Sequence, residues 1–203
     1  MTTRTFPAIK PNSMTWELIA NSQQFVALSG AIQTAQRPGQ RWTVQLEYAA
    51  LVAADRAVLQ AFVVQVLGQA DNFTLTPHDY SPRGAFEIKA GFSRAQINGA
   101  SQTGNSLSIE KCKNDTANWI RAGDFFQIGT ELKMATADAS SDGSGEITIE
   151  FVPELRTSPA NNSDVIVSDP AGVFRFVQPR MGWSSRPPFI SSMTLECVED
   201  ITA

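Results

Sequence analysis

Two stretches near the start of the chain alternate between apolar and polar residues with a period of two. Because successive side chains of a β-strand point to opposite faces, residues 14–20 and 41–49 predict strands with one buried face each. The residues between them predict one or two further short strands and a turn at Arg37-Pro38-Gly39, where proline presets φ and glycine tolerates unusual backbone angles. The predicted buried faces comprise Met14, Trp16, Leu18 and Ala20 in the first strand, and Trp42, Val44, Leu46 and Tyr48 in the second.

A different period follows in residues 51–71. Apolar residues recur there at steps of three and four, which is the pattern of an amphipathic helix, and several alanines raise the helix propensity. Gly68 is predicted to end the helix in a left-handed cap. The predicted apolar stripe comprises Val58, Leu59, Phe62, Val63, Val66 and Leu67.

The middle of the chain reads as short strands separated by Gly, Asn, Asp and Ser clusters, as in a small barrel or sandwich. Residues 119–155 predict two arms of a β-ribbon joined by a hairpin loop at residues 138–146, with Asp142-Gly143 and Gly145 as turn residues. The predicted apolar faces comprise Phe126 and Ile128, continued by Leu132 and Met134 after the Gly129-Thr130 turn, and Ile147, Ile149 and Phe151 on the return strand.

The last third returns to strands in which Met193, Leu195 and Cys197 alternate with more polar neighbours. We therefore predict a mainly β fold: a β-sandwich domain with one helix, made of residues 1–89 and 169–203, and an inserted OB-like β-barrel domain, residues 90–168. Charge supports the division, because residues 92–165 hold 6 Lys/Arg and 10 Asp/Glu, so 6 − 10 = −4, whereas the remainder holds 10 of each.

Composition weighs against several classes of function. The net charge of −4 is unfavourable for binding duplex nucleic acid, whose affinity comes mainly from Lys and Arg. The sequence contains no apolar run of about 18 residues and no apolar signal segment. We therefore expect that the protein is made in the cytoplasm and does not insert into a membrane. Cys112 and Cys197 lack a neighbouring Cys or His, which favours buried, reduced thiols over a disulfide or a metal site.

The order of these segments resembles the distal tail proteins of long-tailed, siphovirus-type bacteriophages. The resemblance rests on the strands with RPGQRWTVQLEY, the helix leading to LGQADNFTLTPHDYSPRG, the barrel segment with FFQIG and the final strand with SSMTLECVE. It implies a virion structural protein at the tail tip, assembled in the host cytoplasm. Six copies would close a ring that joins the tail tube protein to the baseplate hub or fibre proteins, with no catalytic residue and no cofactor. The resemblance does not identify which residues of this sequence would form the ring contacts.

The residues that could carry chemistry have simpler interpretations. His78, Asp79 and Ser81 share one loop, whereas a catalytic triad usually converges from separate loops, so a turn-stabilising role is favoured. The pairs Glu146/Glu150 and Asp138/Asp142 are explained as solvent-facing positions of the ribbon and its loop. Calcium at Asp138, Asp142 and Glu146 would depart from EF-hand spacing. We predict no catalytic, cofactor-binding or metal-binding residue.

Aromatic residues leave an alternative open. Phe125, Phe126 and Trp119 could stack on single-stranded nucleic acid in an OB-type barrel, but the segment is acidic and core packing is favoured. Trp119, Trp183 and Tyr80 could each stack on a sugar if exposed. The alternative function is therefore a carbohydrate-binding tail-tip module for attachment to the host surface.

Overall fold

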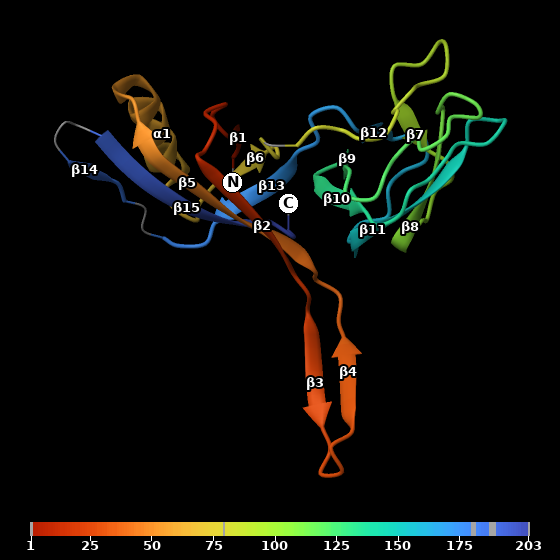
Figure 1. Ribbon diagram of the computed structural model, residues 1–203, viewed down its shortest axis with the longest axis horizontal. Coiled ribbons are helices and arrows are strands. Elements are labelled where there is room, and N and C mark those ends of the chain that lie inside the picture. Colours follow the sequence, from red (N-terminus) through yellow and green to blue (C-terminus); the bar gives the residue numbers. More distant parts are fainter. Residues whose placement is uncertain (1, 79, 180–181, 187–189, 203) are drawn as a thin grey trace.

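The computed structural model describes the whole chain except residues 1, 79, 180–181, 187–189 and 203. Within this part the fold is mainly β with one helix, and its strands form a seven-stranded sheet, a closed six-stranded barrel and a separate two-stranded sheet (Figure 1). The prediction of a mainly β fold with one helix and a small, OB-like barrel is confirmed.

The seven-stranded sheet unites strands from both ends of the chain. Its order is β1-β6-β13-β15-β5-β2, with β14 paired to β15 beside this path. β1 and β6 are parallel, and the other neighbours are antiparallel. The strands are β1 (Thr3–Thr5), β2 (Ser13–Ile19), β5 (Arg41–Leu51), β6 (Asn72–Leu75), β13 (Gly172–Phe176), β14 (Ser184–Arg186) and β15 (Ile190–Glu199).

The alternation in the sequence sets the buried face of this sheet. In β5 the side chains of Trp42, Val44, Leu46 and Tyr48 are buried, as predicted. Leu46 pairs with Leu195 of β15 in register, and directly paired residues share a face, so the apolar faces of the two strands coincide.

Helix α1 (Ala53–Val66) covers the buried face of the sheet. Its Phe62 ring lies 5.5 Å from the ring of Phe73 in β6 and 6.4 Å from that of Phe176 in β13. The helix ends in left-handed backbone at Leu67, with φ of 52°, and the predicted Gly68 is also left-handed, with φ of 69°. The predicted stripe is also too wide, because Val58 and Leu67 are exposed whereas Leu59, Phe62, Val63 and Val66 are buried.

The barrel closes in the order β10-β11-β8-β7-β12-β9, with β9 paired back to β10. Closure leaves none of these strands with a fully free edge. Its core includes an edge-to-face contact between Phe126 and Phe151, whose ring centroids lie 5.6 Å apart. The strands are β7 (Ala95–Ile97), β8 (Gly104–Glu110), β9 (Phe125–Ile128), β10 (Glu131–Ala135), β11 (Ile147–Leu155) and β12 (Asp164–Ile166).

The hairpin of β9 and β10 reverses one predicted face. Its two-residue turn pairs Ile128 with Glu131 and Phe126 with Lys133, so the face of Phe126 continues through odd-numbered residues of β10. Leu132 is therefore on the other face and packs into the core of the sheet domain. The predicted continuation of the Phe126 face through Leu132 and Met134 is wrong. After a two-residue turn, even-numbered residues of β9 pair with odd-numbered residues of β10, so Glu131 and Lys133 share the face of Phe126.

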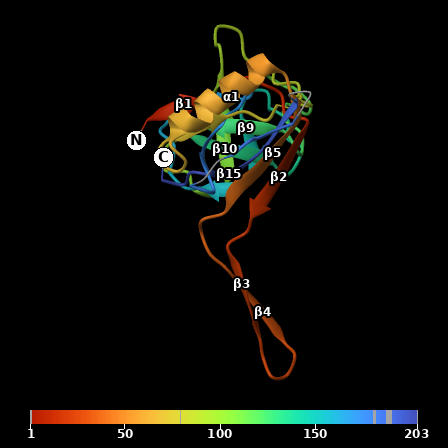
Figure 2. The same cartoon turned by 90° about the vertical axis from the view of Figure 1, so that its left-hand side faces the viewer.

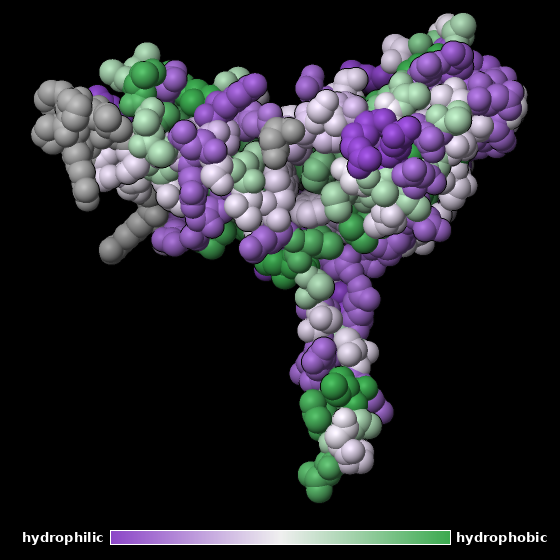
Figure 3. Space-filling view, viewed as in Figure 1, coloured by the Kyte–Doolittle hydropathy of each residue, from purple (hydrophilic) through white to green (hydrophobic). Residues whose placement is uncertain are grey.

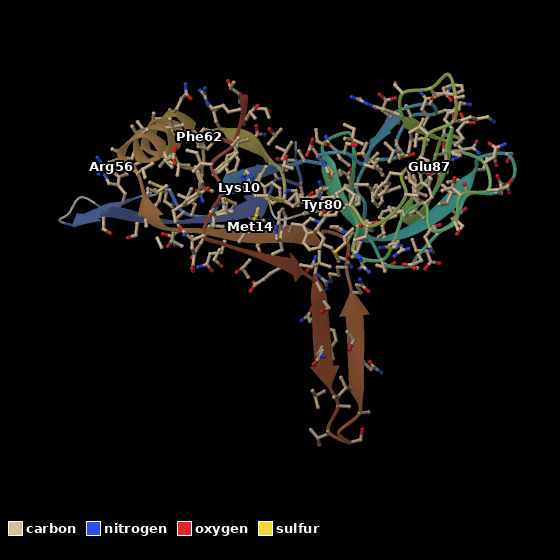
Figure 4. All side chains as sticks on the ribbon, turned by 45° about the horizontal axis from the view of Figure 1, so that its top comes forward. Lys10, Met14, Arg56, Phe62, Tyr80 and Glu87 are labelled. Carbon is tan, nitrogen blue, oxygen red and sulfur yellow. The ribbon has the colours of Figure 1, made fainter. Side chains whose placement is uncertain are left out.

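The barrel strands all lie between β6 and β13 in the sequence. The connection into the barrel already binds to it, since the backbone N–H groups of Arg83 and Gly84 donate to Asp124 at 2.9 and 2.8 Å. Figure 4 shows Glu87 beside the barrel and Tyr80 between the barrel and the sheet domain. The domain boundaries at residues 89/90 and 168/169 stay a prediction.

Candidate assembly surface

A two-stranded hairpin projects from the sheet domain (Figures 1 and 2). It consists of β3 (Ser22–Val26) and β4 (Ile32–Gln36), and residues 22–36 are called the arm below. Every residue of both strands is exposed. An isolated two-stranded hairpin is marginally stable in water at best, so the arm gains little stability from its own chain.

Hydrogen bonds fix the arm at its base. The Asn21 side chain donates to the Pro38 carbonyl at 2.7 Å, and the Arg37 N–H donates to the Asn21 carbonyl at 2.8 Å. The predicted turn at residues 37–39 is thus part of the base of the arm. The hairpin turn lies instead at residues 27–31, where Gly30 adopts a φ of 80° that favours glycine.

The far end of the arm is apolar. Phe25, Val26 and Ile32 are 50%, 70% and 63% exposed, and Leu28 in the turn is fully exposed. Val26 and Ile32 are directly paired, so they form one apolar spot on the same face. Figure 3 shows hydrophobic residues, in green, beside white ones at this end of the arm. Single exposed apolar residues are common, but a contiguous group marks an interaction surface.

The arm also lacks the usual protection of exposed strands. Between Glu17 and Arg37 the sequence contains no charged residue and no proline. Exposed strand edges in natural proteins carry charges, prolines or bulges that prevent pairing with another chain. This charge-free segment is the signal that could have identified the arm from sequence, where only short strands were predicted.

A buried ionic cluster joins the barrel to the sheet domain. The Lys133 Nζ lies 2.6 Å from a carboxylate oxygen of Glu131 and donates to the Glu154 carbonyl at 2.7 Å. Arg156 links the cluster to the sheet, since its guanidinium lies 3.8 Å from Glu131 and 2.9 Å from Glu199 of β15. The Lys133 and Glu199 side chains are fully buried.

Burial and pairing act against each other in this cluster. Burial raises the pKa of Glu131, but Lys133 and the Arg156 N–H and guanidinium more than offset it, so the pKa lies below its usual value. Burial lowers the pKa of Lys133, and the attraction of Glu131 offsets only part of that effect. The cluster therefore holds paired charges in the interior at the junction of the two domains.

In the loop that holds the candidate triad residues, His78 and its neighbour Tyr80 contact the rest of the protein. The His78 ring lies 6.5 Å from the Phe6 ring, and the Tyr80 hydroxyl donates to the Phe125 carbonyl at 3.2 Å. Ser81 is exposed, and Asp79 lies outside the described residues. These contacts hold the loop against the sheet domain on one side and the barrel on the other.

The acidic loop uses its carboxylates as backbone acceptors. Asp142 accepts from the N–H groups of Ser144 and Glu146 at 2.9 Å each, and the Glu146 bond is the largest cause of its lowered pKa. Asp138 accepts from the Ala122 N–H at 2.9 Å. No group of three or more His, Cys, Asp or Glu residues suited to a metal ion occurs in the described part of the chain.

The candidate sugar platforms differ in exposure. Trp119 is buried in the barrel core, which confirms its packing role, and Tyr80 is half-buried. Trp183 is 45% exposed.

Cys112 and Cys197 are buried and unpaired, as predicted. Burial raises the pKa of the Cys112 thiol to about 12 and also raises the pKa of Cys197.

No protein-family model matches this sequence, and no curated protein matches it. The helix that the structure describes is too short to cross a lipid bilayer.

Proposed function

We propose that the protein is a structural component of a bacteriophage tail, a distal tail protein that forms a closed ring joining the tail tube to the baseplate or tail-tip apparatus. The observation that carries the proposal is the arm, because an exposed, charge-free hairpin with an apolar end suits permanent contact with another chain. The location in the tail, the neighbouring tail proteins and the number of six copies in the ring come from the family resemblance.

The distribution of charge supports a ring built by the sheet domain. Residues 92–165, which contain the barrel strands, have a net charge of −4, so barrels packed closely around an axis would repel one another. The remainder of the chain is net neutral and carries the arm. The sheet domains then form the contacts, and the barrels lie apart and present their surfaces to other tail proteins.

A closed ring also explains how the arm is kept from unlimited association. A protrusion that binds a different surface on the next copy makes a head-to-tail contact, which generates a ring if the rotation closes and a filament if it does not. Covering the arm in this way protects both of its edges. The ring is therefore a stable end state for a chain with such an arm.

The proposal is tested by native mass spectrometry and light scattering of the purified protein. We expect a closed oligomer, with six copies from the resemblance. Phe25→Glu on the arm should shift the protein towards monomer, whereas Phe92→Glu on the barrel side should not. The two phenylalanines are matched, being 50% and 46% exposed. A parent protein that remains monomeric at all accessible concentrations would show that the proposal is wrong.

The alternative, a carbohydrate-binding tail-tip module, is favoured by the exposed Trp183, since a partly exposed indole can stack on a sugar ring. Binding of the protein to a glycan array, abolished by Trp183→Ala, would support this alternative. The ring and the glycan contact are measured independently.

A further inference from the structure

The outer face of helix α1 is apolar as well as its inner face. Val58 and Val64 are 51% and 59% exposed, and the small residues Ala57 and Ala61 are also exposed. Ala61 lies three residues from each valine and four from Ala57, so it neighbours all three on the helix surface. A surface helix normally carries charged or polar residues on the face opposite its buried stripe.

Charge is absent from this outer face. The charged residues of the helix are Asp55 and Arg56 in its first turn, and both are partly buried. From Ala57 to Val66 the helix contains no charged residue. The outer face, defined here as Ala57, Val58, Ala61 and Val64, therefore resembles the arm in being exposed, uncharged and mainly apolar; the exposed Gln65, four residues after Ala61, is the polar residue on this side of the helix.

The two surfaces lie at opposite ends of the sheet domain. In Figures 1 and 2 the helix lies at the top of this domain and the arm leaves it at the bottom. A second copy placed below the first would turn its helix towards the arm of the first. Two different complementary surfaces at opposite ends are what a head-to-tail contact requires, whereas a two-fold dimer would bring identical surfaces together.

Other surfaces fit the arm less well. The groove over β2, β5 and β15 is lined by Glu17 and Glu196, whose carboxylates would lose water if an apolar hairpin covered them. Pairing of two arms with each other would protect the strand edges but would leave the outer face of α1 exposed.

We propose that the outer face of helix α1 is the site that receives the apolar end of the arm from a second copy of this chain. This inference rests on the proposed ring and names the contact that builds it. The alanines allow close approach, and Val58 and Val64 flank the space that Phe25 and Leu28 of the neighbouring arm fill.

The size of the contact is consistent with a ring rather than a dimer. A standard interface buries about 800 Å² per partner through roughly 20–30 residues, so the apolar end of the arm, residues 25–32, would bury on the order of 250 Å². One such contact is weak. In a closed ring each copy makes two such contacts, one through its arm and one through its helix. Breaking one contact does not release a copy, because the other still holds it.

The test uses cysteine pairs in the full chain. One protein carries Leu28→Cys and a second carries Ala61→Cys, and the two are mixed under mild oxidation. The native cysteines are buried and do not interfere. We expect a covalent heterodimer, because a disulfide requires Cα atoms within about 7 Å. Mixing Leu28→Cys with Thr148→Cys, on the exposed side of β11, is the control and should give at least tenfold less cross-linked product.

A second measurement keeps the inference separate from the ring itself. Ala61→Glu should raise the dissociation constant of the oligomer at least tenfold, whereas Ala100→Glu in an exposed barrel loop should leave it unchanged. A stable oligomer that lacks the Leu28–Ala61 cross-link and tolerates Ala61→Glu would overturn the helix site and leave the proposed ring intact. A monomeric parent protein would overturn both.

Discussion

Replacing Lys133 by Met tests how the buried cluster holds the barrel against the sheet domain. Met retains most of the volume of the lysine stem, so the change removes the charge without opening a large cavity. Lys133 loses its 2.6 Å contact with Glu131 and its 2.7 Å bond to the Glu154 carbonyl. Glu131 is then left buried without its nearest cation.

The expected cost follows from what remains around Glu131. Breaking a buried ion pair by removing one partner typically costs 3–5 kcal/mol. The backbone N–H groups of Arg156 and Thr157 still donate to Glu131 at 3.2 and 3.1 Å, and the Arg156 guanidinium stays nearby. These contacts place the cost near the lower limit, at about 3 kcal/mol, which lowers the melting temperature of a chain of this size by roughly 6–12 °C.

Urea unfolding followed by tryptophan fluorescence measures this cost, because Trp119 reports on the barrel core and Trp42 on the sheet core. The double variant Lys133→Met/Glu131→Gln should recover at least 1 kcal/mol, since the neutral amide oxygen can still accept the backbone bonds. A single variant within about 0.5 kcal/mol of the parent would refute the reasoning, because removal of a paired buried charge would then carry no cost.

Three further outcomes follow from the described contacts. The pKa of Glu131 in the folded state lies below its usual value of 4.5. The contribution of Glu131 to stability is therefore fully present above pH 4.5 and is lost as the pH falls through the folded pKa. Glu131→Gln should flatten this part of the curve of unfolding free energy against pH, measured by acid titration. Cys112 and Cys197 should react with a thiol reagent in urea but not in the native protein, because both are buried with raised pKa values. Gly84→Ala should destabilise the protein by more than 1 kcal/mol in the same unfolding assay, since the new Cβ would lie 2.4 Å from the Trp119 carbonyl.

Alternation and helical periodicity were sufficient to predict the strands β2 and β5, the helix and the barrel segment. They succeed because each of these elements buries one face, and burial leaves a period in the sequence. The Phe126 face could not be followed into β10 from periodicity alone. Its continuation in β10 depends on the length of the Gly129-Thr130 turn, which decides whether Leu132 or Lys133 enters the barrel.

Lys133 also shows why the junction could not be predicted. A charged residue is normally assigned to a solvent-facing position, yet Lys133 is fully buried because Glu131, two residues away, shares its face and Arg156 and Glu199 complete the cluster. Arg156 and Glu199 lie far from Lys133 in the sequence, so their meeting depends on the tertiary fold. The arm could not be predicted for the opposite reason. None of the residues in its two strands is buried, so the sequence there shows no alternation of apolar and polar residues.

The beginning of β5 connects the three parts of the molecule. Trp42 follows the base of the arm by a few residues, its N–H donates to Glu199 at 3.1 Å, and its indole N–H donates to the Leu132 carbonyl of the barrel at 3.1 Å. The Trp42 ring also lies 5.7 Å from that of Phe125 in β9. Trp42 therefore ties the sheet to the barrel a few residues after the base of the arm. If the proposed ring forms, these contacts would hold every barrel in the same orientation relative to its own sheet domain.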